Sequence, residues 1–170
     1  MKITDINIYR LPSTELAPYL LGKILCIKQN QIIRRARITE TEAYFGEEDT
    51  ACHAHKGRTN RTEVLYHEGG ISYVYLCYGI HALINIISGE SEHPQGVLIR
   101  GIEGFDGPGK LTKHLGIDIS YNKLSLIDSD VIWIEDDGFT PDEILTSPRI
   151  GINYATPEYI EKPWRYYYKY

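Results

Sequence analysis

The chain has 170 residues, 42% of them hydrophobic and 24% charged, which is the ordinary composition of a soluble globular protein that can bury a core. The formal net charge of -5 and the lack of a long basic block argue against a general nucleic-acid coat protein, while leaving room for a local basic patch. The three cysteines form no C-x-x-C pair, and no apolar run approaches the ~20 residues that span a bilayer. Because residues 1–10 lack a signal-peptide pattern, we expect one cytoplasmic domain, residues 1–170, without membrane contact.

The expected elements are short, and strands outnumber helices. Glycines at 22 and 116 indicate helix ends, Pro108 suits a helix start, and alternating apolar residues indicate strands. In chain order we expect a helix at 15–21, strands at 23–28 and 32–44, a polar loop at 49–62, strands at 71–78, 81–88 and 97–103, a helix at 110–115, a strand at 131–135, a helical turn at 141–145 and a strand at 149–152. These elements predict an α+β fold, a curved and mostly antiparallel sheet with short helices at its margins.

Residues 39–53, T-E-T-E-A-Y-F-G-E-E-D-T-A-C-H, combine acidic and aromatic side chains. In an extended strand Glu40, Glu42 and Tyr44 share one face. Burying carboxylates beside apolar groups is costly unless they are paired or used chemically. At this point two hypotheses are open: an edge strand with solvated glutamates, or a carboxylate directed into an aromatic pocket.

Three polar residues lie within otherwise apolar strands: Glu42, Asn85 and Arg100. One buried polar side chain is usually a structural hydrogen-bonding group. Three on neighbouring strands, close to Tyr44 and Tyr75, are more typical of a binding pocket. The pattern therefore favours the pocket hypothesis.

The tyrosines at 75 and 78 extend this interpretation. In a regular strand these two positions point to opposite faces. Tyr75 can then line a cavity, while Tyr78, next to Gly79, projects from its rim.

A metal site is an alternative. His53-x-His55 with Glu42 nearby has the residue types of a ligand set. However, H-x-H is common in loops, and no H-E-x-x-H or cysteine pair accompanies it, so loop or packing roles are favoured. No G-x-S-x-G, P-loop or dinucleotide-binding pattern occurs. We expect neither a metal nor a cofactor.

Several ordered motifs carry a family resemblance: R-I-T-E-T-E-A-Y-F-G-E-E-D-T-A-C-H at 37–53, Y-V-Y-L-C-Y-G at 73–79 followed by Asn85, V-L-I-R at 97–100 and G-P-G-K-L at 107–111. Together they resemble the alkyladenine (3-methyladenine) DNA glycosylase family. The resemblance runs from about Leu16 to Leu115 and returns weakly at Pro163 to Tyr167.

The resemblance implies a monofunctional DNA glycosylase that initiates base excision repair. Such an enzyme flips an alkylated or deaminated purine out of duplex DNA and hydrolyses its N-glycosidic bond, and we expect it to act as a monomer. The implied roles are the general base at Glu42, support of the attacking water at Arg100, base stacking at Tyr44, His53 and Tyr75, discrimination against guanine at Asn85, and insertion into the duplex at Tyr78. Glu40 is then expected to be a structural partner of a basic side chain.

Affinity for DNA should come from phosphate contacts. The best candidates are the basic residues of the loop after His53, namely Lys56, Arg58 and Arg61. The segment 103–107 is shorter than the family pattern, and the C-terminal tail ends early, which puts accessory DNA contacts in question. A second hypothesis remains: a non-enzymatic reader of modified or single-stranded nucleic acid that uses the same aromatic pocket.

Overall fold

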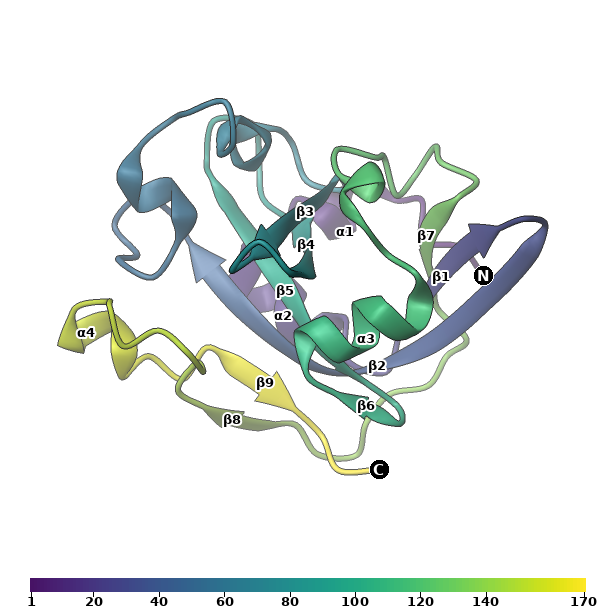
Figure 1. Ribbon diagram of the computed structural model, residues 1–170. Coiled ribbons are helices and arrows are strands. Elements are labelled where there is room, and N and C mark those ends of the chain that lie inside the picture. The colour runs from purple at the N-terminus through teal and green to yellow at the C-terminus, as the bar shows by residue number, and fades with distance from the viewer.

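A curled antiparallel sheet forms the body of the fold (Figure 1), and the computed structural model describes every residue from Met1 to Tyr170. Its strands are β1 (Ile24–Gln29), β2 (Ile32–Phe45), β3 (Ser72–Cys77), β4 (His81–Ile87), β5 (Gln95–Ile102), β6 (Phe105–Asp106), β7 (Ile132–Glu135), β8 (Leu145–Ser147) and β9 (Arg165–Tyr167). The main path runs β3-β4-β5-β2-β1-β7, while β6 pairs with β5, and β9 pairs with both β2 and β8. The long strand β2 therefore lies at the centre of the sheet.

Short helices lie beside the sheet. They are α1 (Ile6–Tyr9), α2 (Ser13–Tyr19), α3 (Pro108–Leu115) and α4 (Pro157–Ile160), with 3-10 turns η1 (His53–Lys56), η2 (Glu63–Tyr66) and η3 (Ile119–Tyr121). Helix α2 packs on β2 and β5, and α3 packs on β4 and β5. The longest helix, α3, has 8 residues, and no helix has the length and apolar character needed to cross a lipid bilayer.

The two-residue repeat of the strands gives the sheet two different faces. On β2, Thr41 and Ala43 are fully buried on the helix side, where the Thr41 hydroxyl donates to the Ala17 carbonyl of α2 at 2.8 Å. Glu42 and Tyr44, one position along, project from the opposite face. The helix-side core gathers Leu16, Leu20, Leu111, Leu115, Ile84, Ile86, Val97 and Ile99. The alternation thus leaves the opposite face free for a polar and aromatic site.

Most predictions about the elements are confirmed. The α+β class, the antiparallel pairing of β1 with β2, and α3 with Pro108 in its first turn agree with the sequence patterns. Strand boundaries agree within one or two residues. The principal difference is that β3 ends at Cys77, so Tyr78 lies in the following turn and not in the strand.

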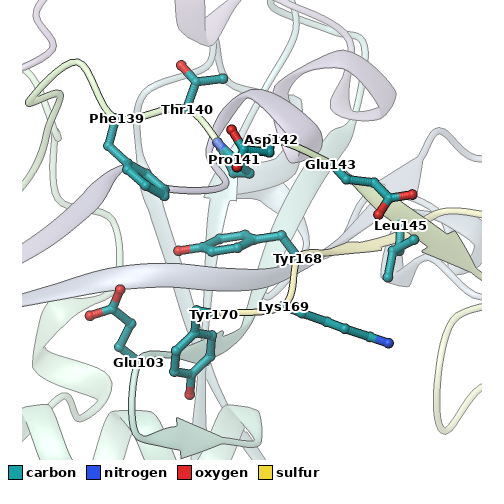
Figure 2. A pocket seen from close by; sticks show the side chains of 10 residues that line it. All are labelled: Glu103, Phe139, Thr140, Pro141, Asp142, Glu143, Leu145, Tyr168, Lys169 and Tyr170. Carbon is teal, nitrogen blue, oxygen red and sulfur yellow. The ribbon is translucent and has the colours of Figure 1, made fainter.

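Two predictions about the C-terminal third are wrong. No helical turn forms at 141–145 (Figure 2), because this exposed segment leads into β8, which pairs with β9 instead. No strand forms at 149–152. The Arg149 side chain is committed to a buried ion pair, and the Ile150 N–H donates to a carboxylate and not to a neighbouring strand.

Candidate active site

A row of paired residues crosses five strands on the face opposite the helices. Tyr73 of β3 pairs with Asn85 of β4, Asn85 with Leu98 of β5, Leu98 with Glu42 of β2, and Glu42 with Arg165 of β9. Directly paired residues project to the same face of a sheet. The pairing register therefore brings residues that are far apart in sequence onto one surface.

Glu42 is the buried charge at the centre of this face, with 0% of its surface exposed. Its Oε1 accepts a hydrogen bond from the Tyr44 hydroxyl at 3.0 Å, and its Oε2 accepts one from the Ile150 N–H at 2.7 Å. Arg100 Nη1 lies 3.5 Å from Oε1. Burial raises the pKa of Glu42, whereas Arg100 and the two hydrogen bonds lower it; the net direction is upward. The contacts of Glu42 thus offset only part of the cost of burying its charged carboxyl.

A local irregularity in the sheet directs Arg100 toward the two glutamates. The register between β2 and β5 shifts on both sides of Glu40, which leaves Arg100 opposite no residue of β2. Such bulges change the direction of a side chain. Arg100 Nε reaches Glu40 Oε2 at 3.1 Å, and Arg165 Nε reaches the same oxygen at 2.8 Å. The expectation that Glu40 pairs with basic side chains is therefore confirmed.

An aromatic pocket adjoins Glu42. It is lined by Tyr44, Ala51, Cys52, His53, Leu65, Tyr73, Tyr75, Asn85, Gly96 and Tyr154. The His53 and Tyr75 rings lie 4.6 Å apart between centroids, and the Tyr73 and Tyr75 rings lie 5.2 Å apart. The free space is about 40 Å³, room for about three water molecules. Four of the residues named from sequence (Tyr44, His53, Tyr75 and Asn85) thus share one pocket, whereas Tyr73 and Tyr154 were not predicted to line it.

His53 and Asn85 are fixed in the pocket by Tyr73. The His53 Nδ1 lies 2.9 Å from the Tyr73 hydroxyl, and the Asn85 Nδ2 donates to the Tyr73 carbonyl at 3.2 Å. Burial, aided by Arg61 and Lys56, lowers the pKa of His53 to about 4. The imidazole is therefore neutral at pH 7.

Tyr78 lies at the tip of the β3–β4 hairpin with 92% of its surface exposed. The Ile80 N–H donates to the Cys77 carbonyl at 3.1 Å, and the two residues between them, Tyr78 and Gly79, have φ of 52° and 67°. A positive φ is strained for a bulky residue such as tyrosine. The hairpin therefore holds an exposed tyrosine in a conformation that glycine would adopt more easily.

The three basic residues of the phosphate prediction have different surroundings. Lys56, Arg58 and Arg61 are all exposed. Arg58 forms ion pairs with Glu63 and Glu92, whereas the Arg61 guanidinium lies 5.1 Å from the centre of the Tyr75 ring at the pocket. Arg58 would have to exchange two carboxylates for a phosphate. Lys56 and Arg61 face no such competition from an ion pair.

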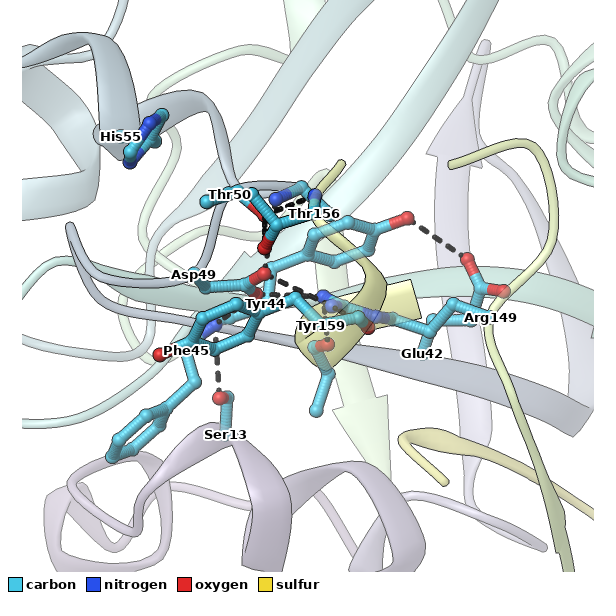
Figure 3. A network of polar contacts seen from close by, with 12 residues as sticks. Ser13, Glu42, Tyr44, Phe45, Asp49, Thr50, His55, Arg149, Thr156 and Tyr159 are labelled. Atoms are coloured by element: carbon cyan, nitrogen blue, oxygen red, sulfur yellow. Dashed lines mark hydrogen bonds and ion pairs between the residues drawn. The ribbon is translucent and has the colours of Figure 1, made fainter. Parts of the chain in front are cut away.

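A buried ion pair behind the pocket was missed by the sequence analysis. Arg149 and Asp49 are fully buried, with Nη1 2.6 Å and Nη2 2.9 Å from the two carboxylate oxygens (Figure 3). The Arg149 guanidinium also lies 4.8 Å from the Tyr44 ring centre and 5.0 Å from that of Trp164. Arg149 immediately precedes Ile150. The ion pair therefore fixes the backbone segment in which the Ile150 N–H donates a hydrogen bond to Glu42. Asp49 and Arg149 are 100 residues apart, and no local sequence pattern indicates that they form a pair.

The two histidines of the metal hypothesis are directed to different partners. His55 Nδ1 lies 2.8 Å from the Glu47 carbonyl, while His53 Nδ1 faces Tyr73. No group of three or more histidine, cysteine, aspartate or glutamate side chains is placed to hold a metal ion. The geometry therefore favours the structural interpretation of these histidines.

The comparisons with known proteins identify the family of the chain. The sequence pattern of the methylpurine-DNA glycosylase family matches residues 7–106 and 103–170, so the two matches meet at the short segment noted above. A protein of Borrelia garinii is 44% identical over 92% of this chain and 91% of its own length, and one of Psychrobacter cryohalolentis is 45% identical over 85% and 82%. One of Clostridium botulinum is 40% identical over 98% and 96%. All three carry the provisional name 3-methyladenine DNA glycosylase.

A buried carboxyl lies beside an aromatic pocket on a curled sheet, and the matching family and relatives are DNA glycosylases. The chain belongs to the methylpurine-DNA glycosylase family and is a DNA-repair enzyme, a hydrolase of N-glycosyl bonds.

The buried ion pair gives a prediction about stability. Asp49→Asn leaves the Arg149 charge buried without its counter-charge, which we expect to lower the free energy of unfolding by about 3–5 kcal/mol. Glu68→Gln, which removes the partly exposed pair with Arg10, is the matched control and should cost at most about 1 kcal/mol. Urea unfolding followed by circular dichroism measures both. Equal, small losses in the two variants would contradict a structural role for the buried pair.

Proposed function

We propose that this enzyme flips damaged purines, 3-methyladenine among them, out of duplex DNA and hydrolyses the N-glycosidic bond with a water molecule activated by Glu42. The observation that carries the proposal is a fully buried carboxyl in contact with an arginine and with the wall of an aromatic pocket. Perturbed, buried carboxyls beside a pocket are frequent in catalytic sites. The names of the relatives support the substrate class.

The pocket suits a flipped, alkylated purine. Tyr44, His53 and Tyr75 offer ring faces on which a base can stack, a contact worth ~1–3 kcal/mol per base. An N-alkylated purine is cationic, and aromatic faces attract cations. His53 is neutral at pH 7, so it does not repel that charge. The same charge makes the base a good leaving group.

Entry of a base requires side chains to move, because the free space is only about 40 Å³. Tyr154 is the most exposed wall residue at 69%, and its hydroxyl donates to the Ala51 carbonyl. Arg61 lies against Tyr75 and is exposed. Displacing these two side chains disturbs neither Glu42 nor its three partners.

In the reaction, Glu42 accepts a proton from water that attacks C1′ of the sugar, and its charge stabilises the developing oxocarbenium ion. Each Glu42 oxygen accepts one hydrogen bond in the free enzyme and keeps a second lone pair for a water. Arg100 favours the ionised form of the carboxyl by lowering its pKa, although burial keeps the net shift upward. No lysine lines the pocket, in keeping with a monofunctional enzyme.

Two further residues set selectivity and access. Asn85, held by its bond to the Tyr73 carbonyl, meets the exocyclic amine of guanine with a clash or an unpaired donor. Tyr78 enters the duplex at the position of the extruded nucleotide and offsets part of the cost of flipping. The protein acts on DNA as a monomer in the reducing cytoplasm, where its three cysteines stay free.

The central test is Glu42→Gln. Removing the base should slow release of 3-methyladenine from alkylated duplex DNA by about 10²–10⁴-fold while DNA binding persists. Glu48→Gln, an exposed carboxyl on the same segment, is the control and should release base normally. Free base is measured by chromatography with EDTA present, and binding by fluorescence anisotropy. Full activity of the Gln variant would sink Glu42 as the base, and binding without release by the wild type would favour the reader hypothesis.

The raised pKa of Glu42 predicts the pH dependence of the chemical step. Only the ionised form is a base, so single-turnover release should increase with pH through an acid limb above the ordinary carboxyl value of 4.5. Arg100 lowers this pKa, so Arg100→Gln should move the limb to higher pH. Arg34→Gln, an exposed arginine of β2, should leave it in place. An unchanged limb in the Arg100 variant contradicts the electrostatic role of Arg100.

Tyr78 can be tested separately from the fold. Tyr78→Gly removes the inserting ring and also removes the strain of a positive φ, so stability should change by less than about 1 kcal/mol. Base release from duplex DNA should fall on the order of ten-fold, whereas release from single-stranded DNA should change much less. Ile32→Ala, at another exposed hairpin tip, is the control. Equal losses on both DNA forms would argue against insertion.

A further inference from the structure

The buried Arg149–Asp49 pair connects several segments of the chain that meet near Glu42 (Figure 3). Besides its two bonds to the carboxylate, Arg149 donates from Nη1 to the Ala43 carbonyl at 3.0 Å and from Nη2 to the Tyr159 carbonyl at 3.1 Å. Ala43 is the residue that follows Glu42 in β2, and Tyr159 belongs to α4. One guanidinium therefore binds the central strand and the C-terminal helix as well as its counter-charge.

Asp49 extends these connections to the loop that forms the pocket wall. Its Oδ2 accepts a hydrogen bond from the Phe45 N–H at 3.0 Å, and its Oδ1 accepts one from the Ala51 N–H at 3.0 Å. Phe45 is the last residue of β2, and Ala51 lines the aromatic pocket. The carboxylate thus fixes the turn between the strand that carries Glu42 and the loop that carries the pocket wall.

Two of the three groups that contact the Glu42 carboxyl are attached to Arg149. The Ile150 N–H, which donates to Oε2 at 2.7 Å, belongs to the next residue in the chain. The Tyr44 hydroxyl donates to Oε1 at 3.0 Å, and its ring centre lies 4.8 Å from the Arg149 guanidinium. The third group, Arg100, is positioned from β5 instead. The carboxyl therefore has two separate supports, and Arg149 provides one of them.

The backbone around Ile150 depends on this side chain for its position. The segment 149–152 forms neither helix nor strand, so no ladder of backbone hydrogen bonds aligns the Ile150 N–H with Glu42. Arginine suits the task because its planar fork binds a carboxylate with two bonds while its face stacks on an aromatic ring. Arg149 does both, with the Trp164 ring centre 5.0 Å from its guanidinium.

We propose that Arg149 and Asp49 are positioning residues for the proposed reaction. Their ion pair places the Ile150 N–H on one carboxylate oxygen of Glu42 and the Tyr44 hydroxyl on the other. Neither member of the pair lines the aromatic pocket, so both act through the groups that they hold. The inference rests on the proposed role of Glu42 as the general base.

The consequence for Glu42 has a definite direction. Hydrogen bonds to the ionised form of a carboxyl lower its pKa, and both the Ile150 N–H and the Tyr44 hydroxyl act in this way on Glu42. The positive charge of Arg149 acts in the same direction. Loss of the pair should therefore raise the pKa of Glu42 further. The other charged and titratable groups that influence Glu42 stay in place in the test, namely Glu40, Arg100, Tyr154 and Arg165.

The first test is Asp49→Asn combined with Arg149→Gln, which replaces the ion pair by two amides and leaves no uncompensated buried charge. Carboxyl ¹³C NMR titration of the protein without DNA should show a higher pKa of Glu42 than in the wild type, with the signal assigned from Glu42→Gln. Arg10→Gln combined with Glu68→Gln, which removes a partly exposed pair, is the matched control and should leave this pKa unchanged. Circular dichroism monitors folding. An unchanged pKa of Glu42 in the folded double variant would overturn the inference.

Arg149→Lys separates placement from charge and serves as the second variant. Lysine keeps the positive charge beside Asp49, but it has no planar fork with which to bind the same three acceptors. The pKa of Glu42 should still rise, by less than in the double variant, because the Ile150 N–H is displaced. A wild-type pKa of Glu42 in the lysine variant would mean that only the charge matters, and would contradict a positioning role.

Base release gives an independent measurement. In the Asp49→Asn, Arg149→Gln variant, single-turnover release of 3-methyladenine at neutral pH should fall by about 10²-fold, because the base is misplaced. Its acid limb should move to higher pH, and affinity for undamaged duplex DNA should persist. Parallel losses of release and DNA affinity with the limb in place would indicate a general collapse of the pocket and would refute the inference. Failure of the proposed function is distinguishable, since Glu42→Gln would then still release base.

Discussion

A carboxyl removed from water, Glu42, is the constraint on which the rest of the site depends. Its burial is costly, and the cost is offset by groups from three parts of the chain: Tyr44 on its own strand, Arg100 on β5 and the Ile150 N–H. Each of these groups needs support of its own. A double register shift and Glu40 orient Arg100, and the Arg149–Asp49 pair fixes both Ile150 and the Tyr44 ring. The compensation remains incomplete, so the pKa of Glu42 stays above its usual value.

The alternation of the strands serves stability and chemistry at once. Thr41 and Ala43 face the helices and the core, while Glu42, between them, faces the opposite side, where it accepts a hydrogen bond from the pocket residue Tyr44. A one-residue slip of β2 would exchange the two sets, burying the carboxyl in the apolar core and exposing the core residues. The register that gives the fold its stability is therefore the same register that forms the site.

What could be predicted from sequence was local or periodic. The sharing of one face by Glu40, Glu42 and Tyr44 follows from a two-residue repeat within one strand. The contribution of Arg149 could not be predicted this way, because its partner Asp49 is 100 positions earlier and the segment around it has no repeat. The expected strand at 149–152 failed for the same reason, since a buried ion pair and a backbone bond to Glu42 replace strand pairing there. Tyr154 was overlooked because an exposed loop carries it to the pocket.

The proposed catalytic residues lie on paired strands, whereas the residues proposed to control access have exposed side chains. Glu42 and Arg100 stand on paired central strands, where their geometry is fixed before substrate arrives. Tyr154 lines a pocket of about 40 Å³ and Arg61 lies against its wall residue Tyr75, while Tyr78 lies at the tip of the β3–β4 hairpin; all three side chains are exposed. In the proposed mechanism the side chains that move to admit a base are exposed ones, and the contacts of Glu42 stay intact. The proposed mechanism therefore selects a base largely by how easily it leaves the DNA helix and stacks in the pocket, and the proposed base Glu42 then acts on whichever base has been admitted.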